Sequence, residues 1–204
     1  MTWTPDRLTQ LATGYWHSAA LLAAVELGIF DALANGPQPA DAIAKAVGGQ
    51  TPLVTAVLDA VVSIGLLSRV DADSYVIAPA ADALLLRSSP TCMLDALRYN
   101  VDLYRHWGRR AEVVRTGDAI GLQQKQLGDD PAATRRFVLG MESKARAFAP
   151  AIAPLIRLDD NEQTLLDVGS GPGTLSRLLA ERRAGLRVTL SDLPQVLAVA
   201  KEIN

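Results

Sequence analysis

The sequence TLLDVGSGPGTLSRLLAERRAGLRVTLSDLP, residues 164–194, contains the order of elements that decides the fold. Its first apolar run, Leu165–Val168, has the length of a short buried strand and leads directly into a glycine-rich loop. A helical stretch, Thr174–Arg183, follows the loop, and a second strand is predicted at Leu186–Leu190. Another helix begins at Pro194. Strand, helix, strand and helix in this order open a doubly wound parallel α/β sheet.

The loop GSGPG, residues 169–173, is a predicted ligand cradle. Glycine has no Cβ, so the chain can turn sharply there and a ligand can approach the backbone. The helix that follows offers free N–H groups and the positive end of its dipole to a carboxylate or phosphate. Asp192 follows the second strand, where a carboxylate can accept both hydroxyl hydrogens of a ribose. We therefore predict a ligand that contains adenosine.

The glycine spacing distinguishes between classes of nucleotide ligand. The dinucleotide fingerprint G-x-G-x-x-G requires a glycine at position 174, where this chain has threonine, so NAD is disfavoured without being excluded. A phosphate-binding P-loop is disfavoured more strongly, because no Gly-Lys-Ser/Thr follows. The loop suits a ligand with an amino-acid end, with its carboxylate near Gly169, Gly171 and Gly173 and its ammonium near Asp167 or a backbone carbonyl. S-adenosylmethionine has this shape.

The chain before this pattern is rich in alanine and leucine at helical spacing. The stretch Leu8–Ile29 has apolar residues in steps of three and four, which predicts a helix whose seam can pack on a partner helix. Further helices are predicted at Thr91–Arg115 and from Asp130, the latter ended or kinked by Pro150 and Pro154. A polar cluster at residues 158–163 then marks a change of pattern.

We place the domain boundary at this cluster. Residues 1–158 are predicted to form a helical domain with linker helices, and residues 159–204 to begin the α/β domain. Within the first, residues 39–78 have the order of a winged helix: two short helices across a glycine turn, then a β-hairpin. DNA binding is not expected, because the second helix, Thr51–Ile64, has no lysine or arginine, and residues 39–78 have two basic side chains against four acidic ones.

The composition excludes further classes of protein. The chain has 20 lysines and arginines against 22 aspartates and glutamates, without the basic excess required for general nucleic-acid or anionic-membrane binding. The apolar run Ala19–Val25 stops at Glu26, so neither a signal peptide nor a membrane span is expected. Cys92 is the only cysteine, which excludes an internal disulfide and a cysteine-based zinc site and favours a cytoplasmic location.

Residues 165–173 and 191–194 resemble the first two motifs of the plant-type and bacterial small-molecule O-methyltransferases. The strings GYWHSAA, residues 14–20, and ELGIFDAL, residues 26–33, resemble the dimerisation domain of that family. The resemblance implies a winged-helix-like dimerisation domain followed by a Rossmann-like domain that binds S-adenosylmethionine. It also implies a homodimer formed by the N-terminal helices, and in-line methyl transfer to a hydroxyl of a small, cyclic or aromatic, metabolite.

Individual site residues follow from the same resemblance. Gly169 matches the glycine of the cofactor loop and Asp192 matches the acid that binds the ribose. Phe137 and Met141 match a helix that packs near cofactor and substrate, although such residues on a helix face are also ordinary core residues. The chain has Ala145 where many relatives have a serine, which puts one cofactor contact of the family in doubt.

A general base is missing from the predicted site. In the family it is a histidine of a later motif, and neither His17 nor His106 has a spaced carboxylate or second histidine that would orient it as a base. Two parallel strands alone also leave their edges and one apolar face without neighbours. We therefore expect a C-terminally truncated methyltransferase, inactive by itself. The alternative is a catalytically inactive dimerisation or regulatory module that pairs with a relative through residues 8–29.

Overall fold

The computed structural model describes residues 2–117, 128, 130–159, 161 and 163–204. The chain divides into two compact units between Cys92 and Met93, and the predicted domain boundary near residue 158 lies within the second unit. The long helix α10 (Pro131–Ile152) packs on the helices that follow the glycine loop and the second parallel strand, so the linker helices belong to the same unit as the strands.

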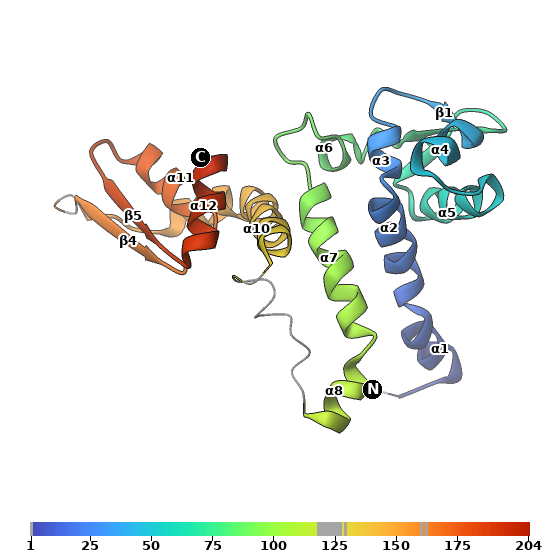
Figure 1. Cartoon of the computed structure of the whole chain (residues 1–204), viewed down its shortest axis with the longest axis horizontal. Helices are drawn as coiled ribbons and strands as arrows, with labels where there is room; N and C mark the ends of the chain where they lie inside the picture. The colour runs from blue at the N-terminus through green and yellow to red at the C-terminus, as the bar shows by residue number, and fades with distance from the viewer. Residues whose placement is uncertain (1, 118–127, 129, 160, 162) are drawn as a thin grey trace. The chain divides into compact units, whose positions relative to one another are not determined.

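The first unit is helical with a small antiparallel sheet (Figure 1). Helices α2 and α4 both pack on α5, and the three strands have the order β1-β3-β2. The predicted hairpin is present as β2 and β3, with Leu67 opposite Ile77, while the third strand, β1, was not predicted. The elements are α1 (Pro5–Thr13), α2 (Tyr15–Leu27), α3 (Ile29–Ala32), β1 (Gln38–Pro39), α4 (Ala40–Val47), α5 (Thr51–Ile64), β2 (Leu67–Arg69), β3 (Ser74–Ile77) and α6 (Asp82–Leu85).

The predicted single helix over residues 8–29 is wrong, because the chain forms α1, α2 and α3 there, separated at Gly14 and Gly28. Gly28 has the left-handed φ of 79° that ends α2. The apolar seam is divided as well. Its C-terminal members are buried in the unit's own core, and its N-terminal members are exposed. The buried members are Leu22, Val25 and Ile29, and the exposed ones are Leu8, Leu11 and Tyr15.

The second unit combines helices with two parallel strands. The predicted helix over residues 91–115 is interrupted after Trp107, where α7 ends and α8 begins at Arg110. Helix α10 passes through Pro150 and continues for one short 3-10 turn, η2. The elements are α7 (Leu94–Trp107), α8 (Arg110–Thr116), α10 (Pro131–Ile152), η2 (Ala153–Leu155), β4 (Thr164–Val168), α11 (Thr174–Arg182), β5 (Arg187–Ser191) and α12 (Pro194–Ile203).

Helix α11 connects β4 to β5 and covers one face of the two-stranded sheet. Leu165 of β4 and Val188 of β5 are paired and pack, with residues of α11 and η2, in a cluster that contains the buried Leu179. The side chains that alternate with these point the other way. Leu166 and Val168 are 62% and 75% exposed, so β4 is buried on one face only, not on both as its apolar run predicted.

Helices α7 and α10 approach closely at Gly140, which lies inside α10. A Cβ at this position would be 2.8 Å from Tyr99 Cβ. We expect Gly140→Ala to lower the free energy of unfolding by about 2 kcal/mol through overpacking, although alanine is the better helix former. Urea denaturation measures the change. The control is Gly108→Ala, where a Cβ has only ordinary contacts and no loss is expected. Unchanged or higher stability of Gly140→Ala would contradict the prediction.

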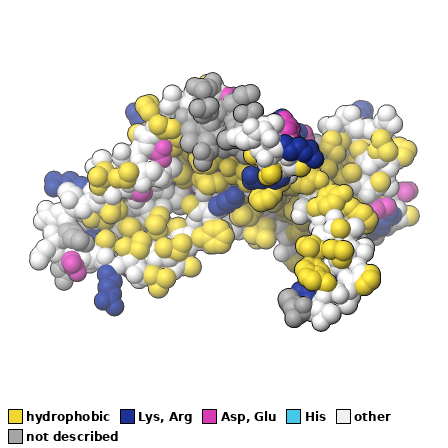
Figure 2. Space-filling model, turned by 90° about the horizontal axis from the view of Figure 1, so that it is seen from below, with side chains coloured by type: hydrophobic (Ala, Val, Ile, Leu, Met, Phe, Trp, Pro, Cys, Tyr) yellow, Lys and Arg dark blue, Asp and Glu magenta, His cyan; other side chains and the backbone are white. Residues whose placement is uncertain are grey.

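Large hydrophobic side chains also reach the surface, and Figure 2 shows several such patches on one face of the molecule. In the first unit Trp3 and Trp16 are each 61% exposed. Within the described residues no single helix is long and apolar enough to cross a membrane, and only the pair α4 and α5, bent by 108°, passes such a test of length and composition together.

Candidate functional site

The glycine loop and Asp192 lie at the same edge of the sheet. Val168, the last residue of β4, is paired with Ser191, the last residue of β5, so both strands deliver their following residues to one place. The amide of Gly169 donates to the carbonyl of Ser191 at 2.8 Å, which joins the loop directly to the end of β5. This is the carboxyl edge of a parallel pair, where open α/β sheets bind ligands.

The three loop glycines all have a left-handed backbone, which allows the sharp turn that the sequence predicted. Their φ values are 70°, 53° and 76° for Gly169, Gly171 and Gly173. A Cβ on Gly169 or Gly171 would meet no atom within 4 Å, so the backbone there is open to a ligand. Gly173 faces inward, because a Cβ on it would lie 2.6 Å from Leu190 Cδ1. The first two glycines therefore form the accessible side of the loop and the third its packed side.

The carboxylate of Asp192 fixes the loop as well as facing the site. Its Oδ2 accepts a hydrogen bond of 2.7 Å from the amide of Gly171, and its Oδ1 accepts one of 2.7 Å from the amide of Leu193. The side chain is half-buried. Each carboxylate oxygen has a second acceptor position, so the group can also receive hydroxyl hydrogens. The sequence predicts a role of Asp192 toward a ribose but gives no signal for the bond to Gly171.

Asp167 and Ser170 are the other polar side chains of this edge. Asp167 is half-buried on the face of β4 that α11 covers, and its Oδ2 accepts a hydrogen bond from the hydroxyl of Ser176 on α11. The Ser170 Oγ is buried and has no hydrogen-bond partner, the one such side-chain atom among the described residues. A loop with open glycines and one unsatisfied hydroxyl is compatible with a bound polar ligand.

The two α10 residues matched by resemblance lie in different surroundings. The ring of Phe137 packs edge to face on Tyr99, with centroids 5.5 Å apart, and contacts the buried cluster of Val138, Val196 and Val199. Phe137 is thus a core residue in this structure. Met141 is half-buried one turn further along α10, and its predicted place beside the cofactor stays a prediction.

A buried glutamate that the sequence analysis did not single out lies next to Met141. Glu142 is 4% exposed, and its carboxylate accepts hydrogen bonds from Thr174, the first residue of α11, from Arg146 at 2.7 Å and from Arg177 at 3.2 Å. Burial raises the pKa of Glu142, but the hydrogen bonds from these three residues outweigh it and leave the pKa below its usual value. Glu142 therefore remains a charged group at neutral pH.

Neither histidine is arranged as a base. His17 is exposed on α2 in the first unit, and His106 on α7 forms a 2.5 Å hydrogen bond between its Nδ1 and the carbonyl of Asp102 in the same helix. In the described part of the chain no group of three His, Cys, Asp or Glu residues could hold a metal ion. Of the two histidines, His17 belongs to the first unit, and the Nδ1 of His106 is bonded within its own helix.

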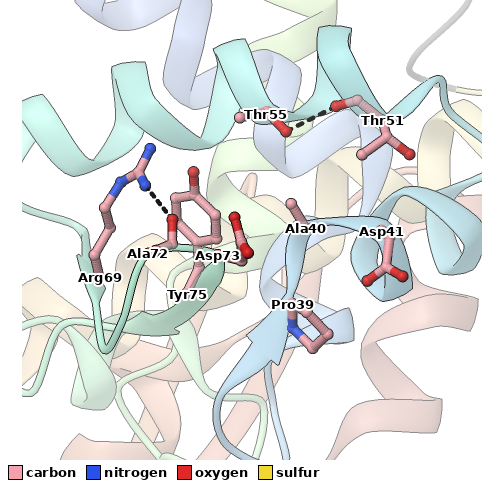
Figure 3. Close-up of a pocket in the computed structure, with 9 residues that line it drawn as sticks. All are labelled: Pro39, Ala40, Asp41, Thr51, Thr55, Arg69, Ala72, Asp73 and Tyr75. Carbon is pink, nitrogen blue, oxygen red and sulfur yellow. Dashed lines mark hydrogen bonds between the residues drawn. The ribbon is translucent and has the colours of Figure 1, made fainter.

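A separate cavity of about 560 Å³ lies in the first unit, between the starts of α4 and α5 and the hairpin (Figure 3). Arg69, which lines this cavity, has partners in the hairpin and in α5. Arg69 donates to the carbonyl of Ala72 at 2.6 Å and to Asp59 at 2.5 Å, and Asp59 also accepts the hydroxyl of Tyr75 at 2.7 Å. Burial and Asp59 raise the pKa of Tyr75 to about 12. Arg69, the one basic residue of the hairpin, is thus held by neighbours within the unit.

Comparisons with known proteins agree on one group of enzymes. Residues 9–87 match the family model of the O-methyltransferase dimerisation domain. The chain is 32% identical to the tetracenomycin polyketide synthesis 8-O-methyl transferase of Streptomyces glaucescens and 29% identical to the phenazine O-methyltransferase of Lysobacter antibioticus. These matches cover 94% and 95% of this chain, and 58% of each relative.

A solved structure of a methyltransferase is also similar to this chain. The human N-acetylserotonin methyltransferase in complex with SAM superposes with a TM-score of 0.82 at 26% identity. The superposition covers 99% of this chain and 64% of that one. The chain thus spans about three fifths of the length of the proteins that it matches.

Proposed function

We propose that this protein transfers a methyl group from S-adenosylmethionine to a hydroxyl of a small molecule. The proposal starts from residues 9–87, which match the family model of the O-methyltransferase dimerisation domain. The cofactor supplies an electrophilic methyl on a sulfonium. In the transfer the carbon–sulfur bond breaks as the carbon–oxygen bond forms, the hydroxyl proton passes to a base, and S-adenosylhomocysteine and the methyl ether are released. The acceptor is expected to be cyclic or aromatic.

The residues of the loop edge have distinct roles in this proposal. Asp192 would accept hydrogen bonds from the ribose hydroxyls, and the open backbone at Gly169 and Gly171 would hold the amino-acid end of the cofactor. Asp167 is assigned to its ammonium and Met141 to its surroundings. The observation that carries the proposal is the bond from the Gly171 amide to the Asp192 carboxylate, because it joins the two predicted halves of the binding site in one geometry.

The finer description of the domains belongs to the same proposal. Residues 39–78 are assigned to a winged-helix-like module, and β4 to α12 to the start of a Rossmann-like domain that begins near residue 159. The N-terminal helices are assigned to a homodimer interface. The exposed Leu8, Leu11 and Tyr15 support this, since apolar side chains at helical spacing on a surface are typical of contact sites. No described residue is assigned as the base, so these 204 residues alone are expected to be inactive.

Calorimetric titration with S-adenosylhomocysteine tests the proposal in the protein that carries this chain. We expect saturable binding, and we expect no binding of NAD, because residue 174 is threonine and the third glycine of the dinucleotide loop is missing. Titration of S-adenosylmethionine should give the same stoichiometry. Binding of NAD with no heat from either sulfur compound would contradict the proposal and favour a dinucleotide enzyme.

A further inference from the structure

A chain of hydrogen bonds connects α10 with the glycine loop. It begins at Glu142, whose carboxylate accepts from Thr174 at the start of α11 and from Arg177 one turn later. Arg177 also donates to the side-chain oxygen of Asn204, which follows α12. The side-chain Nδ2 of Asn204 in turn donates to the carbonyl of Pro172 within the loop at 2.8 Å. Both the loop and the residue after it are thus bonded to one network.

A packing role alone does not account for a charge at this position. A carboxylate that is only 4% exposed loses its hydration, and an apolar side chain of similar size would hold α10 against α11 at least as well. Hydrogen bonds differ from apolar contacts in being directional. A carboxylate that receives three donors therefore specifies one position of Thr174 and Arg177 relative to α10.

The loop has two sets of restraints that act on different residues. Asp192 and the end of β5 hold the amides of Gly169, Ser170 and Gly171. The Glu142 network holds the other end, at the Pro172 carbonyl and at Thr174. A ligand that lies against the open backbone of this loop binds more tightly when both ends are already fixed, because the entropy of ordering a loop opposes binding.

We propose that Glu142 is a positioning residue for the cofactor loop, acting through Thr174 and, by way of Arg177 and Asn204, through Pro172. The inference rests on the proposed function, since it gives the loop its ligand. It assigns to α10 a part in cofactor binding that does not require direct contact with the cofactor.

The experiment is a double-mutant cycle on ligand affinity, with Glu142→Gln, Thr174→Val and the double variant titrated with S-adenosylhomocysteine. We expect each single change to weaken binding about tenfold, and the double change also about tenfold, because coupled residues are not additive. Thr174→Ser keeps the hydroxyl and should bind like the unchanged protein. The control is Arg135→Gln, which removes an ion pair from α10 to Glu202 on α12 and should leave affinity unchanged.

Hydrogen exchange without ligand gives a second, independent readout. Glu142→Gln should speed exchange of the amides at residues 169–175 about tenfold, whereas Arg135→Gln should not. Unchanged affinity and unchanged exchange in both Glu142→Gln and Thr174→Val would overturn the inference. If the unchanged protein binds no S-adenosylhomocysteine, the proposed function fails, and exchange alone then decides whether Glu142 holds the loop. Affinity losses that multiply in the double variant would also overturn a route through Thr174.

Discussion

Changing Asp192 to asparagine should weaken the binding of S-adenosylhomocysteine by about a hundredfold or more. The carboxylate already accepts from the amides of Gly171 and Leu193, one on each oxygen. Asparagine replaces one of these oxygens with an NH₂ group. This group is a donor and cannot accept the hydrogen bond from the backbone N–H. The change removes charge-assisted bonds worth about 1.5–3 kcal/mol each, and 1.4 kcal/mol is a factor of about ten in affinity.

The Asp192 prediction has a control of the same chemistry. Glu181→Gln also removes one negative charge, on the exposed side of α11, and should change neither affinity nor melting temperature. Calorimetric titration gives the dissociation constants, and a thermal scan of both variants shows that they are folded. An Asp192→Asn protein that melts normally and binds with unchanged affinity would rule out the ribose assignment and the proposed cofactor site with it.

Changing Gly173 to alanine should lower the free energy of unfolding by about 3 kcal/mol. Two effects add at this position. The φ of 76° costs an L-residue about 1 kcal/mol, and the new Cβ would lie 2.6 Å from Leu190 Cδ1, where overpacking costs about 1–3 kcal/mol. Leu190 belongs to β5, and its side chain must shift to make room for the new Cβ.

Gly171→Ala separates the two effects. Its φ of 53° is also left-handed, but a Cβ there meets no atom within 4 Å, so a loss of only about 1 kcal/mol is expected. Urea denaturation of both variants gives the two free energies of unfolding, which are compared at equal m-value. Equal losses for Gly171→Ala and Gly173→Ala would show that Leu190 yields without cost and that conformation alone requires glycine at position 173.

The parts of the site that depend on neighbouring residues could be predicted from the sequence. The loop glycines allow a sharp turn, and the spacing of apolar runs places Asp192 at the end of a strand, so both follow from local rules. The same local rules misplaced longer features. Single helices were predicted over residues 8–29 and 91–115, where the chain breaks at Gly14, Gly28 and after Trp107, since periodicity alone does not reveal a break.

Features that depend on distant pairing could not be predicted in this way. Glu142 precedes its partner Thr174 by 32 residues. From the sequence alone, a glutamate on an amphipathic helix is expected to be an ordinary surface residue. The division of the chain after Cys92 could not be predicted for the same reason. It depends on the packing of α7 on α10, two helices that are distant in the sequence. The one usable hint was Gly140, a glycine inside a helical pattern, which often marks close packing.

The network around Glu142 also constrains how this chain can change over generations. Loss of Thr174 or Arg177 alone would leave a buried carboxylate short of donors, and loss of Glu142 alone would leave their donors without their shared acceptor. Variants that lack one member are therefore expected to be less stable than either the complete set or a wholly apolar replacement. The effects of substitutions at positions 142, 174 and 177 on the free energy of unfolding are expected to be coupled.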